Sequence, residues 1–182
     1  MRAAILREHG AIPEVGDFDE PAPDEHGQVV EVLAAGLNPV DIALASGTFY
    51  GGAPPLPSVV GKEGIGRTAG GDRVYFDTPL APYGSVAERA KVHAASLFPV
   101  PEEDVADELV LAFGIAGLAA WLSLEKAEVQ EGETVLVLGA SGMVWARSPY
   151  RRRSSLAPDA WWPPRATRRA SRVRVSSGRT LR

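Results

Sequence analysis

The sequence has no cysteine and only three histidines among its 182 residues. The missing thiols exclude disulfides and every zinc site that depends on cysteine ligands. No run of about 18 apolar residues predicts a membrane span, and the N-terminus shows no signal peptide. These absences favour a soluble cytoplasmic protein. The length leaves room for one ordinary domain and part of another, and 45% hydrophobic residues can support a packed core.

Charge is distributed unevenly along the chain. Residues 143–182 contain eleven arginines, no lysine and a single acid, Asp159, which gives this segment a net charge of +10. Residues 1–142 carry 8 basic and 22 acidic side chains, a net charge of −14. Three of the four tryptophans also lie among the last forty residues. The two parts of the chain therefore differ in composition as two unrelated sequences would.

Short segments bounded by glycine and proline predict β-strands in the first hundred residues. The strand-like segments are residues 1–6, 28–37, 71–76, 84–92 and 95–101. Their spacing predicts a compact, mostly β, barrel-like domain.

The pattern changes near residue 102. Apolar residues recur at helical spacing over residues 102–127, and Gly114 and Gly117 interrupt them, which predicts two helices or one closely packed helix. A polar turn, an apolar strand over residues 134–138 and a glycine-rich turn follow. A strand that is apolar at nearly every position is typical of a parallel sheet covered on both faces.

Six segments in order resemble the medium-chain dehydrogenase/reductase superfamily, specifically its zinc-independent NADPH:quinone reductase-like branch. They are AAGLNPVDIALASGTF (34–49), LPSVVGKEGIG (56–66), GDRVYF (71–76), GSVAERAKV (84–92), AGLAAW (116–121) and GETVLVLGASG (132–142). The resemblance implies a GroES-like alcohol dehydrogenase-type domain over residues 1–101. Connecting helices and the first strand of an α/β Rossmann domain would occupy residues 102–144. It also implies NADPH as cofactor, a small quinone, enone or carbonyl substrate, and frequent homo-oligomers.

Two positions distinguish this chain from the zinc-dependent relatives. Those relatives place a cysteine where this chain has Asn38, and a histidine where it has Lys62. An amide is a poor zinc ligand, and an ammonium group has no lone pair to donate. We therefore expect hydride chemistry without a metal.

Asn38 and Tyr50 are the expected catalytic residues, and both assignments have structural alternatives. Asn38 could contact cofactor or substrate, or could shape the turn before Pro39, while Asp41 caps the following helix. Tyr50 matches a region where relatives line the substrate pocket with an aromatic residue, but it could equally be a half-buried loop tyrosine. Glu63 is expected to be a structural partner rather than a general base.

The glycine-rich turn predicts the cofactor site. Its expected cofactor-binding residues are Asn38, Gly139, Ala140, Ser141, Gly142, Met143 and Val144. Glycines at such a turn let backbone N–H groups approach a pyrophosphate at a helix N-terminus. The last glycine of the motif is expected at position 145, where the chain has Trp145, and Pro149 opposes the helix that should follow.

Three interpretations account for residues 145–182. They could form a basic arm that contacts nucleic acid or acidic membrane, as part of a non-catalytic binding module. They could be a linker or disordered tail. They could also be the parent gene read out of frame, because skipping two bases after Val144 converts the Trp145 and Ala146 codons into a glycine codon. The shifted text continues as helix, turn, strand and helix, with an arginine after the second strand that favours NADP.

We favour the frameshift, which predicts a disordered, arginine-rich tail and an inactive chain. It also predicts no nucleic-acid or membrane partner.

Overall fold

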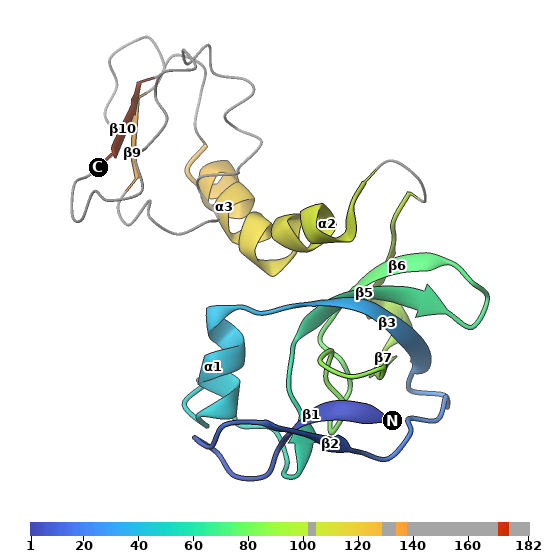
Figure 1. The fold of residues 1–182 in the computed structure, drawn as a ribbon. Helices are drawn as coiled ribbons and strands as arrows, with labels where there is room; N and C mark the ends of the chain where they lie inside the picture. The colour runs from blue at the N-terminus through green and yellow to red at the C-terminus, as the bar shows by residue number, and fades with distance from the viewer. Residues whose placement is uncertain (102–104, 129–133, 138–170, 175–182) are drawn as a thin grey trace. The chain divides into compact units, whose positions relative to one another are not determined.

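The computed structural model of the chain describes residues 1–101, 105–128, 134–137 and 171–174. They belong to two compact units, Met1–Ile115 and Ala116–Arg182 (Figure 1). The expected cofactor residues 139–144 and most of the arginine-rich tail lie outside the described residues.

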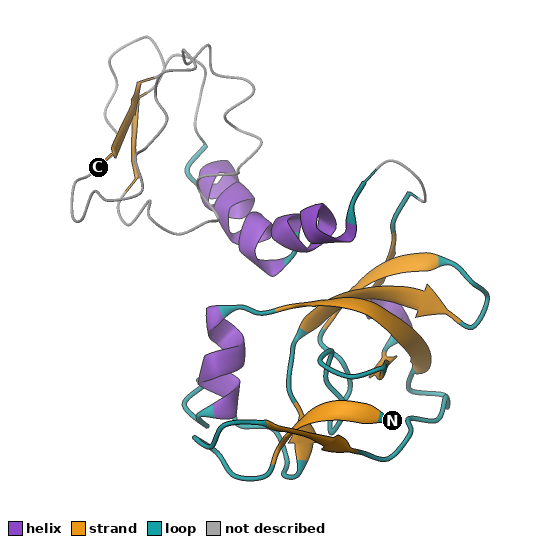
Figure 2. Cartoon of the chain, viewed as in Figure 1, coloured by secondary structure: helices purple, strands orange, loops and turns teal. Residues whose placement is uncertain are grey.

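The first unit is built mainly from antiparallel strands (Figure 2). A three-stranded sheet has the order β2-β1-β4, and a five-stranded sheet has the order β7-β3-β5-β6-β8. The strands of the smaller sheet are β1 (Arg2–Leu6), β2 (Glu14–Asp17) and β4 (Ser58–Val59). Those of the larger sheet are β3 (Gln28–Gly36), β5 (Glu63–Thr68), β6 (Arg73–Asp77), β7 (Arg89–Val92) and β8 (Leu97–Pro99).

Each sheet buries its own cluster of apolar side chains. In the larger sheet the buried cluster consists of Val30, Val74, Phe76, Ala90 and Val92. In the smaller sheet it consists of Ala3, Ile5 and Val59. Full burial of a valine- or phenylalanine-sized side chain contributes about 1.5–3 kcal/mol relative to its exposure. Because the buried side chains of each cluster come from strands far apart in sequence, long-range contacts stabilise the unit.

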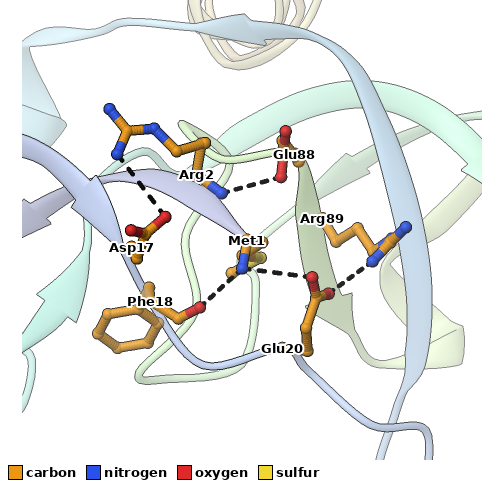
Figure 3. A network of polar contacts seen from close by, with 7 residues as sticks. All are labelled: Met1, Arg2, Asp17, Phe18, Glu20, Glu88 and Arg89. Atoms are coloured by element: carbon orange, nitrogen blue, oxygen red, sulfur yellow. Dashed lines mark hydrogen bonds and ion pairs between the residues drawn. The ribbon is translucent and has the colours of Figure 1, made fainter.

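A polar network ties the start of β1 to segments more than fifteen residues away (Figure 3). The Met1 ammonium group donates to the Phe18 carbonyl oxygen at 2.9 Å and pairs with Glu20 at 3.2 Å. Arg89, on β7, donates to the other Glu20 oxygen at 2.6 Å. Arg89 holds the pKa of the Glu20 carboxyl below its usual value, and the Met1 ammonium adds to this effect. The network joins β1, the segment after β2 and β7.

Helix α1 (Pro39–Ala45) follows β3 directly, and its start is fixed by its own residues. The Asn38 N–H donates to Asp41 Oδ2 at 2.7 Å, and the Asp41 N–H donates to the Asn38 carbonyl oxygen at 2.9 Å. Pro39 occupies the first turn, where a missing N–H costs no hydrogen bond. The structural interpretation of Asp41 as a capping residue is confirmed.

Helix α2 (Asp107–Phe113) is anchored to the larger sheet by a buried arginine. Arg73, on β6, is 7% exposed and forms an ion pair with Asp107 at 2.5 Å. Its guanidinium also donates to the carbonyl oxygens of Pro101 and Val105 at 3.1 and 2.8 Å. One side chain of the larger sheet therefore contacts Pro101, Val105 and the first residue of α2.

In the second unit the structure describes helix α3 and two strands. Helix α3, whose first residue belongs to the first unit, spans Ile115–Lys126. Strand β9 (Thr134–Val137) pairs antiparallel with β10 (Ser171–Arg174), with Val135 opposite Val173. This strand was not predicted from the sequence, which favoured a disordered tail.

Most of the predicted elements have counterparts in the structure. Strands at 1–6, 28–37 and 71–76 correspond to β1, β3 and β6, while only residues 89–92 of the predicted 84–92 form a strand. The helical segment breaks at Gly114, the first of the two glycines expected to interrupt it. No single helix among the described residues is long and apolar enough to span a membrane; α2 and α3 reach that threshold only when counted together.

Candidate active site

A pocket of about 110 Å³ lies between α1, β4 and the loop that follows β6. Its polar lining consists of Asp41, Ser58, Lys62, Thr78 and Tyr83. Its apolar lining includes Leu6, Leu44, Val59, Pro79 and Pro82. Apolar walls with a few converging polar groups are typical of small-molecule sites. The whole pocket belongs to the first unit.

Lys62 is held against the pocket wall through Thr78. The Lys62 ammonium donates to Thr78 Oγ1 at 3.0 Å, and the Thr78 N–H donates to the Lys62 carbonyl oxygen at 2.8 Å. Thr78 has a φ of +48°, a left-handed conformation that is rare for a β-branched residue. The preceding Gly61 has a φ of +101°, and a Cβ there would collide with the Ser85 hydroxyl. Unusual backbone conformations therefore occur at Gly61, next to Lys62, and at Thr78, which accepts the hydrogen bond of the Lys62 ammonium.

Asp41 faces the same pocket from α1 and is 8% exposed. Its Oδ2 accepts the Asn38 N–H, while its buried Oδ1 has no hydrogen-bond partner among the described residues. Burial raises the pKa of the Asp41 carboxyl, and the main-chain N–H groups of Asn38 and Lys62 oppose that rise. A buried oxygen without a partner is costly, so an adjacent ligand or water would be favourable.

The Asn38 side chain is tied to Glu63. Asn38 Nδ2 donates to Glu63 Oε1 at 2.5 Å, and a carboxylate can only accept, so the amide nitrogen is oriented toward it. Asn38 itself is half-buried. The structure thus places the predicted catalytic residue beside the start of α1 with one amide N–H committed to a structural partner.

Glu63 is 2% exposed and accepts hydrogen bonds from three groups. Besides Asn38 these are the Tyr75 hydroxyl at 2.6 Å and the Ile115 N–H at 2.8 Å. Burial raises the pKa of Tyr75, and its hydrogen bond to Glu63 raises it further. A Cβ on Gly114 would collide with Glu63 Oε2. The expectation that Glu63 is a structural partner agrees with this arrangement.

Tyr50 lies apart from these groups. It is 97% exposed, and its ring lies 4.4 Å from that of Phe49, centroid to centroid. Tyr50 is not among the residues that line the pocket. The structure therefore does not bring Tyr50 and Asn38 together within the first unit.

Comparison with known proteins gives a consistent result. No profile of a known protein family matches the chain. The human quinone oxidoreductase is 35% identical over 159 residues, an alignment that covers 79% of this chain and 47% of the human protein. A 2-methylene-furan-3-one reductase from tomato is 32% identical over 133 residues, covering 64% of this chain and 34% of the relative.

The solved structures agree. The quinone oxidoreductase from Thermus thermophilus, solved alone and in complex with NADPH, has a TM-score of 0.70 and 33% identity. That similarity covers 80% of this chain and 48% of the Thermus protein. The chain belongs to the quinone-reductase-like family of medium-chain dehydrogenases/reductases. It spans about half the length of the family members that it matches.

The family's glycine-rich turn, at Gly139, Ala140, Ser141, Gly142, Met143 and Val144, lies outside the described residues. Asn38 is thus the one predicted cofactor residue among the described residues. Among the described residues, no group of three or more histidine, cysteine, aspartate or glutamate side chains could hold a metal.

Sequence reasoning did not identify the grouping of Lys62, Asp41 and Thr78 around a pocket. It treated Lys62 only as a residue unable to bind zinc, and it gave Thr78 no role. The signal available in the sequence was a lysine between a glycine and a glutamate, Gly61-Lys62-Glu63. The contact with Thr78, sixteen residues later, could not be inferred from spacing.

Proposed function

We propose that the intact protein is an NADPH-dependent, zinc-independent reductase of quinones, enones or similar carbonyl compounds. The observation that carries the proposal is the 35% identity to quinone oxidoreductases across four fifths of the chain. The pocket in the first unit supports it, because its apolar walls and single lysine suit a small, uncharged carbonyl compound. The partner would accordingly be a small molecule.

In this proposal NADPH would supply the hydride, and the expected cofactor contacts are Asn38 and the turn at residues 139–144. The backbone of the Gly139–Val144 turn would bind the pyrophosphate, since such turns present N–H groups to anions. Asn38 would contribute at the nicotinamide end, with its amide oriented by Glu63 at 2.5 Å. Tyr50 is retained as an expected substrate contact, although its exposed ring does not line this pocket.

We propose further that the chain as it stands leaves its parent reading frame after Val144 and is inactive. Trp145 occupies the position of the last motif glycine, and Pro149 opposes the helix that should follow. The change to eleven arginines in residues 143–182 supports this. Predicted cytoplasmic location and homo-oligomeric assembly are retained for the frame-restored protein, to be tested by fractionation and by light scattering.

The test compares the chain as it stands with a frame-restored chain that continues as a Rossmann domain. We expect NADPH oxidation coupled to quinone reduction only in the restored chain, with NADPH preferred to NADH and no loss of activity in EDTA. A restored chain carrying Gly142→Val is the matched control, because the side chain would block the backbone from the pyrophosphate. Equal activity of the two chains would refute the frameshift, and inactivity of both across quinones, enones and aldehydes would refute the reaction.

A further inference from the structure

Lys62 is the one cation among the described residues that line the pocket, and Asp41 is the one acid. Their opposite charges make the lining neutral overall when both are ionised. An anionic ligand would meet the Asp41 carboxylate, and a cationic ligand would meet the Lys62 ammonium. The lining therefore suits an uncharged ligand that can accept a hydrogen bond.

The Lys62 ammonium has donors to spare. It carries three N–H groups, and the described residues accept one of them, at Thr78 Oγ1. That contact lies at an exposed position, so the other N–H groups face solvent, which a ligand in the pocket could replace. The backbone strain at Thr78 also supports a binding role for this part of the pocket. Unfavourable φ values such as that of Thr78 persist where surrounding contacts enforce them, and they cluster at functional sites.

We propose that Lys62 binds the carbonyl oxygen of a small uncharged enone or quinone in this pocket and acts as the hydrogen-bond donor to that oxygen during reduction. The ring would lie against the apolar lining formed by Leu6, Leu44 and Pro79. The choice of carbonyl compounds as the ligand class rests on the proposed function.

For an enone, the hydride that NADPH would supply forms a C–H bond at the β-carbon and leaves NADP⁺. The C=C electron pair shifts toward the carbonyl carbon, and the C=O pair moves to the oxygen, which becomes anionic. That oxygen takes a proton from the Lys62 ammonium, and the neutral amine regains a proton from water. A positioned ammonium favours this anion because it needs no solvent reorganisation.

Binding can be tested on the chain as it stands, without NADPH. The sequence has only three lysines, Lys62, Lys91 and Lys126, so lysine labelled with carbon-13 at the ε position gives three signals. Cyclohex-2-enone is a suitable probe, since a chain without cysteine cannot consume it by thiol addition. We expect a saturable shift of the Lys62 signal. The Lys91 and Lys126 signals should not move, because Lys91 is paired with Asp24 and Lys126 is exposed on α3.

Variants separate a specific contact from loss of structure. Lys62→Met should weaken enone binding about tenfold or more, as expected for a lost hydrogen bond to a charged donor. Lys62→Arg should retain part of the affinity, and Lys126→Met should bind as the unmodified chain does. Far-UV circular dichroism confirms that each variant is folded. An unmoved Lys62 signal up to the solubility limit of the enone would overturn the proposal, as would tighter binding of benzoate than of the enone.

Kinetics of the frame-restored chain distinguish this inference from the proposed function. Lys62→Met should lower kcat about 10²–10³-fold, the usual loss for a donor to a developing oxyanion, with the NADPH dissociation constant unchanged. If the restored chain is inactive but the lysine signal still reports enone binding, the proposed reaction fails and the binding site stands. An active restored chain in which Lys62→Met retains full kcat would refute the catalytic role.

Discussion

The first unit and helix α3 differ in how far their side chains are buried. In Met1–Ile115 even charged groups are buried with partners, as Glu63 is with three donors and Arg73 is with Asp107. In α3 only Ala120 is buried, while Trp121 and Leu122 are 52% and 49% exposed. The first unit is an arrangement of long-range contacts, whereas α3 is a helix formed by its local pattern.

The difference shows that the local sequence pattern that forms a helix does not by itself bury the side chains of that helix. A helical rhythm is enough to specify α3 in sequence, yet burial of its apolar side chains requires another segment. In the first unit, each strand finds its pairing partners within its own sheet. Strand β3, for example, pairs with both β5 and β7. Substitutions should therefore matter more in the first unit than in α3.

The largest effect is expected for Arg73→Met. It would leave Asp107 and the carbonyl oxygens of Pro101 and Val105 without the buried guanidinium. Because Arg73 is buried but the Asp107 side chain is 32% exposed, the loss should be about 2–4 kcal/mol, below that of a fully buried pair, and should appear as a lower free energy of unfolding in urea. Arg67→Met, on the exposed side of β5, is the control and should cost less than about 1 kcal/mol. Equal losses in the two variants would contradict the anchoring role of Arg73.

Gly114→Ala should have the next largest effect. The added methyl group would collide with Glu63 Oε2 and with the Tyr75 ring, and overpacking of this kind costs about 1–3 kcal/mol. Gly70→Ala is the matched control, because a Cβ there would meet its nearest atom at an ordinary 3.5 Å. We expect urea unfolding of Gly70→Ala to match the unmodified chain within about 0.5 kcal/mol. A Gly114→Ala variant as stable as that control would show that this site is less tightly packed.

The third prediction concerns alkaline pH. The pKa of Tyr75 is raised in the folded chain, so above its ordinary value of 10.0 the unfolded chain releases a proton that the folded chain keeps. Stability should be unaffected by Tyr75 below pH 10 and should then fall by about 1.4 kcal/mol per pH unit. Tyr75→Phe should lose this slope, although it is less stable at neutral pH because Glu63 loses a donor. Identical slopes in denaturant titrations at pH 9 to 11 would refute the assignment.

The smallest effect is expected in α3. Trp121→Gln replaces a side chain that is 52% exposed, and unfolding of the first unit followed by far-UV circular dichroism should change by less than about 0.5 kcal/mol. Phe76→Ala, at a fully buried position of the larger sheet, should cost about 3–5 kcal/mol in the same measurement. A loss above 1 kcal/mol for Trp121→Gln would mean that α3 contributes to the first unit's stability.

The sequence predicted much of the fold and less of the site. Alternation and turn residues identified β1, β3 and β6, and glycine identified the break between α2 and α3. The short strands β2 and β4 were not predicted, because two to four residues carry too little pattern to distinguish a strand from a loop. The functional roles of Asn38 and Tyr50 came from family resemblance and that of the turn at 139–144 from its glycine pattern, and all of them remain predictions.

By itself the sequence determined the family, the exclusion of cysteine-based zinc sites and the contrast between residues 1–142 and the arginine-rich end. These follow from residue identity and from local order along the chain. Only the tertiary structure decided that Lys62 is hydrogen-bonded to Thr78 at the pocket. It also decided that Glu63 accepts hydrogen bonds from Asn38, Tyr75 and Ile115. Those contacts join residues 12 to 52 positions apart, and no local pattern records them, because the pairing of strands brings them together.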